Sequence, residues 1–213
     1  MSFYKTNTMK IVLFLFDNYT ALDVVGPYEV LSKLPNAQVF LTGTEKKCYS
    51  DSHGLKITAD YTIDEVLEAD ILLIPGGFGI DVVLKDQSVI EWVKKIDKTT
   101  QWTISVCAGS LLLAEAGFLN GKKCTSHWGR KKQLRNYDVI VPDLSERYVQ
   151  DGKYITSAGV SAGIDMALFL VSLIAGDVTA QVIQLAMEYN PLPPFDGGTP
   201  EKTPKEIMEK MRR

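Results

Sequence analysis

The chain has few of the residues that stabilise small secreted proteins or bind metals. Its 213 residues include only three cysteines, Cys48, Cys107 and Cys124, and two histidines, His53 and His127. An odd number of cysteines without framework spacing excludes a disulfide scaffold and indicates a reducing compartment. No histidine lies at ligand spacing from cysteines or carboxylates, so we expect no bound metal.

Strong charge and long apolar runs are also missing. A net charge of −3 gives no electrostatic footprint for nucleic acid or an anionic membrane, so neither is an expected partner. The apolar run Ile11–Phe16 is too short for a signal sequence or a membrane span, and the expected location is cytoplasmic. The glycine-rich stretch 75–79 lacks phosphate-loop and dinucleotide spacings, and gives no support for a nucleotide cofactor.

The chain does contain a regular alternation of apolar strands and helical patterns. This alternation predicts a doubly wound, mostly parallel α/β sheet with helices on both faces. We expect one domain over residues 9–198, followed by a helical tail over 199–213. The predicted strands are Met9–Phe16, Gln38–Thr42, Ala69–Ile74, Trp102–Val106 and Lys123–Ser126, and the main helical patterns are Ala21–Leu34, Val89–Ile96, Val160–Ala175 and Val178–Tyr189.

Several shorter elements follow from local signals. Gly26-Pro27 interrupts the first helical pattern, so that helix is expected to begin near Pro27. Thr62–Glu65 is a capping-box pattern that predicts a short helix, and Leu55–Ala59 alternates as part of an edge hairpin. Asp151-Gly152 predicts a hairpin turn, and Thr203-Pro204 opens a short terminal helix.

Cys107 lies at the end of a predicted strand and just before a strong helical run. Small residues occupy the next three positions, Ala108 to Ser110, as in a strand-to-helix nucleophile elbow with Cys in place of Ser. A helix N-terminus favours the thiolate over the thiol. The alternative is an ordinary buried cysteine.

Asp23 is a carboxylate flanked by apolar residues. It is interpreted either as a helix cap or as an acid in a dry pocket, with a raised pKa, that can donate a proton. In a doubly wound sheet, ligands bind at the carboxyl ends of the strands. We therefore expect Asp23, the Gly76-Gly77 loop and Cys107 to converge on one edge.

Other candidates surround this edge. The backbone N–H groups of Gly77 and Ala108 are suited to an oxyanion site, although a plain turn needs glycine equally. His127 follows a predicted strand and is either a partner of the cysteine or a satisfied polar group at a strand end. The pattern around His53 indicates turn chemistry.

The motifs PGGFG, SVCAGSLLLAEAGFLNGKK, TSHW and ITSAGVSAGIDMALFLV occur in this order. With them, the chain resembles the ThiJ/PfpI superfamily of class I glutamine-amidotransferase-like proteins over nearly its whole length. The segments LDVVGPYEVL, AGIDMALFL and QLAMEYNPLPPFDGGTP are most similar to the isonitrile hydratases of that superfamily.

The resemblance implies a flavodoxin-like fold, a homodimer, a small-molecule substrate and no cofactor. It also implies that Cys107 adds to an isocyanide to give a thioimidate, with Asp23 as acid and base, and that water releases an N-substituted formamide. His127 matches a family position beside the pocket, and the candidate oxyanion and substrate-binding residues are Gly77, Phe78, Ala108 and His127.

Ala108 departs from the family pattern. It stands where the hydratases have Thr and where protease-like relatives have His. The leading hypothesis is an isonitrile-hydratase-like enzyme. The absence of a His side chain at position 108 argues against the second hypothesis, an amidase-, protease- or deglycase-like cysteine hydrolase. A third hypothesis, a non-catalytic sensor with an oxidisable Cys107, stays open.

Overall fold

A computed structural model describes residues 8–142 and 146–211, and its centre is a seven-stranded sheet with the order β5-β2-β1-β6-β7-β9-β8. All neighbouring strands are parallel except β8 and β9, which confirms the expected doubly wound, mostly parallel architecture. The strands are β1 Met9–Phe14, β2 Ala37–Gly43, β5 Tyr61–Thr62, β6 Ile71–Ile74, β7 Trp102–Ser105, β8 Tyr148–Asp151 and β9 Tyr154–Ser157; β3 Cys48–Ser50 and β4 Lys56–Thr58 form a separate antiparallel pair.

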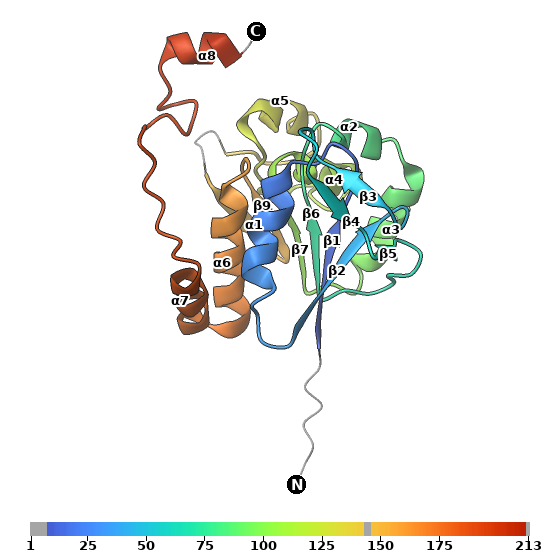
Figure 1. Ribbon diagram of the computed structural model, residues 1–213. Helices are drawn as coiled ribbons and strands as arrows, with labels where there is room; N and C mark the ends of the chain where they lie inside the picture. Colours follow the sequence, from blue (N-terminus) through green and yellow to red (C-terminus); the bar gives the residue numbers. More distant parts are fainter. Residues whose placement is uncertain (1–7, 143–145, 212–213) are drawn as a thin grey trace.

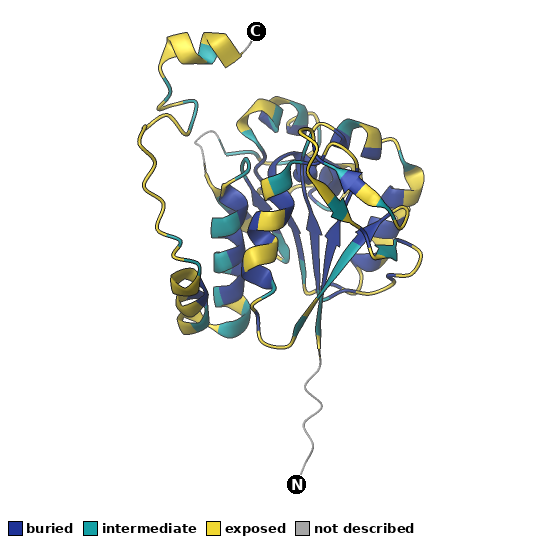
Figure 2. Cartoon of the chain, viewed as in Figure 1, coloured by how far each residue is buried: buried dark blue, intermediate teal, exposed yellow. Residues whose placement is uncertain are grey.

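Helices cover both faces of the sheet. Helices α1 and α6 lie side by side on one face with α7 outside α6, and α3 lies on the other face (Figure 1). Figure 2 shows the central strands as buried except at their amino ends. The helices are α1 Ala21–Leu31, α2 Ile80–Val83, α3 Gln87–Ile96, α4 Ser110–Glu115, α5 Lys131–Leu134, α6 Ala162–Ala175, α7 Asp177–Ala186 and α8 Lys205–Met211, with single 3-10 turns at Cys107–Gly109 and Trp128–Arg130.

The prediction that the first helix begins near Pro27 is wrong, because α1 begins at Ala21 and contains Pro27. Proline removes one backbone hydrogen bond, but α1 buries an apolar face that includes Val24 and Val30, and the packing of this face outweighs the local signal. The early start places Asp23 in the first turn of the helix.

The capping-box pattern at Thr62–Glu65 forms its contact without a helix. The Thr62 N–H donates to Glu65 Oε2 at 2.9 Å, but the chain makes only a turn there. The chain beyond this turn is bound to α3, where the indole N–H of Trp92 donates to the Val66 carbonyl at 2.9 Å.

The remaining short predictions are mostly confirmed. The hairpin at Asp151-Gly152 joins β8 to β9, residues 56–58 form the second strand of the separate hairpin, and the terminal helix is α8. The strand expected before His127 is reduced to an isolated bridge between Lys123 and Ile140. The domain boundary after residue 198 stays a prediction, and the last two residues of the expected tail lie outside the described residues.

Candidate active site

The topology brings three loops to the carboxyl edge of the central strands. The loops after β1, β6 and β7 carry Asp23, Gly76 and Cys107, and these three strands are neighbours in the sheet. The Gly76 N–H donates to Asp23 Oδ2 at 3.0 Å. A Cβ added to Gly76 would lie 2.8 Å from the Cβ of Cys107 and 3.0 Å from Asp23 Oδ2. The expected convergence of these segments on one edge is therefore seen in the structure.

Cys107 lies on a strained turn between β7 and α4. Its φ of +57° is unusual for a residue with a side chain, and such strain clusters at functional sites. The Cys107 N–H donates to Ala158 O at 3.1 Å, and its carbonyl accepts from Ser126 Oγ at 2.8 Å and from Ser110 Oγ at 3.2 Å. These bonds fix the turn, and the residue is only 7% exposed.

Asp23 is fully buried and does not cap its own helix. The N-terminus of α1 has no side-chain cap, and Asp23 Oδ2 instead accepts from Gly76, 53 residues away. Burial raises the pKa of Asp23 from 3.8 to about 7, against the lowering effects of the Gly76 N–H and the Cys107 thiol. Its Oδ1 is buried without a close hydrogen-bond donor among the described residues. An oxygen in this environment is suited to carry a proton at neutral pH.

The thiol and the carboxyl compete for one negative charge. Burial, followed by the charge of Asp23, raises the pKa of Cys107, and this outweighs the expected lowering at a helix N-terminus. The backbone N–H groups of Ala108 and Val160 act in the opposite direction by donating to the sulfur. A thiolate is therefore favoured when Asp23 holds the proton.

Sequence reasoning placed the Gly76-Gly77 loop at the site but missed the contact of Gly76 with Asp23 and the role of Val160. Gly76 must be glycine because an added Cβ would lie 2.5 Å from the Ala108 nitrogen. Val160 has a φ of +48°, a strained value for a β-branched residue, and this conformation helps aim its N–H at the sulfur. The signals in the sequence are the first glycine of PGGFG and the small residues around Val160.

The PGGFG loop packs closely against the chain that follows β1. At Gly77 (φ +136°), an added Cβ would lie 2.3 Å from Asn18 O, so close backbone packing requires glycine there. The side chain of Phe78 is 78% exposed. Roles for the Gly77 N–H and for Phe78 in substrate binding stay predictions.

His127 makes no hydrogen bond to Cys107 among the described residues. Its Nδ1 accepts from the Gly129 N–H at 3.1 Å, which leaves the proton of the neutral ring on Nε2. Burial and the charge of Arg130 lower the pKa of His127. The ring lies flat on Gly159, where an added Cβ would approach Cδ2 to 2.2 Å. His53 lies in a turn whose N–H groups bind Asp51, as expected.

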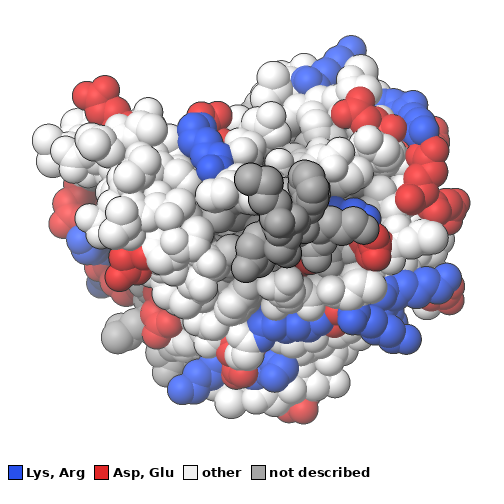
Figure 3. Space-filling model, turned by 90° about the horizontal axis from the view of Figure 1, so that it is seen from below, with Lys and Arg blue, Asp and Glu red and all other residues white. Residues whose placement is uncertain are grey.

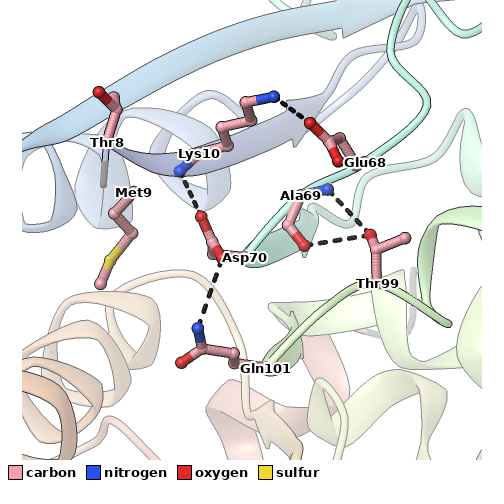
Figure 4. A pocket seen from close by; sticks show the side chains of 8 residues that line it. All are labelled: Thr8, Met9, Lys10, Glu68, Ala69, Asp70, Thr99 and Gln101. Atoms are coloured by element: carbon pink, nitrogen blue, oxygen red, sulfur yellow. Dashed lines mark hydrogen bonds and ion pairs between the residues drawn. The ribbon is translucent and has the colours of Figure 1, made fainter. Parts of the chain in front are cut away.

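Two cavities lie at different distances from the Asp23–Cys107 pair. The larger, about 580 Å³, lies at the amino ends of β1 and β6 and is shown in Figure 4. Its polar groups bind one another, as where the Lys10 N–H donates to Asp70 Oδ2 at 2.7 Å. A smaller cavity of about 140 Å³ is lined by Ser126, His127 and Val160, two of which touch Cys107. Position and chemistry favour the smaller one.

The described residues show no metal cluster and no membrane-crossing element. Within 8–142 and 146–211, no three His, Cys, Asp or Glu side chains gather as metal ligands, and no helix combines the length and apolarity needed to span a bilayer. The face shown in Figure 3 carries interspersed charges of both signs.

Comparison with known proteins gives the family. The model of the DJ-1/PfpI family matches residues 9–173. The chain is 35% identical over 205 residues to an isonitrile hydratase from Pseudomonas putida, covering 96% of this chain and 89% of that protein. It is 29% identical to a deglycase from Pyrococcus furiosus, over 70% of this chain and 89% of that protein.

A ThiJ/PfpI family protein from Pseudomonas syringae has a similar structure, with a TM-score of 0.91 and 30% identity over 98% of this chain and 87% of that one. DJ-1beta from Drosophila melanogaster shares the fold, with a TM-score of 0.77 and 21% identity over 86% of this chain and 100% of that one. The expected resemblance and the flavodoxin-like fold are thus confirmed, and the chain belongs to the DJ-1/PfpI family.

Proposed function

We propose that the chain is an isonitrile-hydratase-like lyase that adds water to an isocyanide and releases an N-substituted formamide. The observation that carries this proposal is the buried Asp23–Cys107 pair. It joins a sulfur nucleophile to a carboxyl whose pKa is raised to about 7. A group with a pKa near the working pH is suited to give a proton and take it back.

The reaction needs only this pair and water. The Cys107 thiolate attacks the terminal carbon of R–N≡C, and protonated Asp23 delivers its proton to that carbon, which gives the thioimidate R–N=CH–S. The Asp23 carboxylate then takes a proton from water as the water oxygen bonds to the same carbon. The second water proton goes to nitrogen, the C–S bond breaks, and R–NH–CHO leaves with the thiolate restored.

The restricted access to the sulfur supports a slender substrate. Cys107 is 7% exposed, so a linear isocyanide tip can approach it more readily than a planar amide can. A hydrolase would also need a base for its nucleophile and leaving group, but His127 is turned to the Gly129 N–H and Ala108 supplies no side-chain base. These features favour hydration over amide hydrolysis.

The decisive test is formamide production from a panel of alkyl and aryl isocyanides, followed by mass spectrometry. Cys107→Ser should abolish turnover because it removes the soft nucleophile with little change in packing, whereas exposed Cys48→Ser is the matched control and should behave as wild type. A thioimidate adduct on Cys107 would support the pathway. A wild-type protein without formamide product, whose Cys107 is instead oxidised to the sulfinic form, would favour the sensor hypothesis.

A second copy of the chain is the proposed partner. Helix α7 exposes Val178, Val182 and Leu185 on one face, at 77%, 61% and 80%. Residues 158–187 contain only two charged side chains, Asp165 and Asp177, and depletion of charge marks interface cores. All three cysteines are free, which fits the proposed cytoplasmic location.

A further inference from the structure

The cavity beside the cysteine has walls from two distant parts of the chain. The inner wall includes His127 and Val160, and Val160 donates its N–H to the sulfur of Cys107. The outer wall is formed by Gly198, Thr199 and Pro200, which belong to the segment after α7. A ligand reaching the sulfur through this cavity therefore meets that segment.

The segment is bound to α6 at its first end, is exposed along most of its length, and is half-buried where it meets the cavity. At the first end, the Tyr189 hydroxyl donates to Asp165 Oδ1 at 2.8 Å, and Asp165 also pairs with Arg147, which lines the cavity. From 190 to 198 the chain is exposed, and it becomes half-buried again at Thr199 and Pro200, where it meets the cavity. Figure 1 shows this stretch running along the outside of α6 and α7.

Local chemistry stiffens the segment. Three of the residues from 191 to 194 are proline, and proline lowers the entropy lost when the chain is fixed in one path. The far end is a compact turn, in which the Thr203 hydroxyl donates to the carbonyls of Gly197 and Thr199, both at 2.7 Å. A stiff segment that ends in a hydrogen-bonded turn can keep Gly198, Thr199 and Pro200 in place, although little of the segment is packed against the domain.

The volume of the cavity limits the size of the substituent that it can hold. At about 140 Å³ it is close to the roughly 150 Å³ of an engineered apolar cavity that accommodates benzene. A substituent of about six heavy atoms fills this volume, and a fused two-ring substituent must extend past the outer wall.

We propose that Gly198, Thr199 and Pro200, the outer wall of this cavity, are the specificity-determining wall of the substrate site and limit the N-substituent to about one six-membered ring. This rests on the proposed isocyanide hydration for its substrate class. The wall itself rests only on the cavity and its position beside Cys107.

The test compares variants that narrow or widen the wall in the full-length protein. An added Cβ at Gly198 has no atom within 4 Å, so Gly198→Trp can be accommodated, and Gly197→Trp is the matched control one residue outside the cavity lining. Pro200→Ala shortens the wall, and Thr203→Val removes the two hydroxyl bonds that hold the turn. The readout is the ratio of kcat/KM for a naphthyl or cyclohexyl isocyanide to that for an ethyl isocyanide.

We expect Gly198→Trp to lower the cyclohexyl-to-ethyl ratio by at least about tenfold, the scale at which a pocket discriminates by size. Pro200→Ala and Thr203→Val should raise the naphthyl-to-ethyl ratio, and Gly197→Trp should stay within about twofold of wild type. Ratios within twofold of wild type for all three wall variants, or an equal change in the control, would overturn the proposal.

A second readout separates this proposal from the proposed function. Alkylation of Cys107 by iodoacetamide and by a bulky aryl maleimide requires no hydratase activity. The same variants should change the maleimide rate and leave the iodoacetamide rate nearly constant. If wild type forms no formamide but the maleimide pattern holds, the hydratase proposal fails and the wall stands; an unchanged maleimide pattern removes the wall.

Discussion

Replacing Asp23 by Asn should stabilise the protein at neutral pH while it removes activity. In the unfolded chain Asp23 loses its proton near pH 3.8, whereas in the folded protein it keeps the proton until about pH 7. Between these values only the folded state binds the proton, so stability falls as the pH rises, and above pH 7 the full cost of the buried carboxylate is present.

The magnitude follows from the two pKa values. Their difference corresponds to about 4 kcal/mol, at roughly 1.36 kcal/mol for each pH unit. Asn can still accept from the Gly76 N–H and carries no charge, so this pH dependence disappears in the variant. The free energy of unfolding of Asp23→Asn, relative to wild type, should rise by about 2–3 kcal/mol between pH 5 and pH 8.

The assay is urea denaturation of both proteins at several pH values under reducing conditions, together with isocyanide turnover. Turnover at pH 7 should fall by about 10²–10⁴-fold, the usual range for loss of a general acid–base group. Asp86→Asn is the control, because that half-buried carboxylate caps α3 far from the Asp23–Cys107 pair in sequence and Asn caps equally well. Parallel stability curves for Asp23→Asn and wild type would refute the buried-charge reasoning, and unchanged turnover would leave Asp23 a structural residue.

Three further predictions concern the same site and the proposed interface. Alkylation of Cys107 should accelerate at a lower pH in Asp23→Asn than in wild type, because the variant removes the carboxylate charge that raises the pKa of the thiol, and an unchanged pH profile would contradict this coupling. Gly76→Ala should cut turnover by about 10²-fold or more, measured with thermal unfolding as a check on folding, because the new Cβ displaces the elbow. Leu185→Lys should shift the species seen by light scattering from dimer to monomer, whereas Val82→Lys, equally exposed on α2, should not; a monomeric wild type contradicts the dimer.

The sequence is informative where local pattern and tertiary packing agree. The apolar runs of β1, β6 and β7 are long and continuous, so the central strands and the elbow at Cys107 can be predicted. The start of α1 could not, because burial against α6 overrides the Gly26-Pro27 signal. The turn at Thr62–Glu65 depends on Trp92, which lies in α3. A reading of the sequence close to residues 62–65 does not include that residue.

The candidate site was harder to predict because its decisive contacts break local rules. Asp23 resembles a cap in sequence, and only its bond to Gly76 on a distant loop identifies it as a buried acid. Cys107 and Val160 both adopt positive φ values that their side chains disfavour, at a cost of about 1–3 kcal/mol each. A chain selected for stability alone would place glycine at such positions and an apolar side chain in place of the buried acid. Strain and buried charge that meet at one sulfur atom therefore indicate chemistry, and the Asp23→Asn stability curve measures how much of that cost one carboxyl carries.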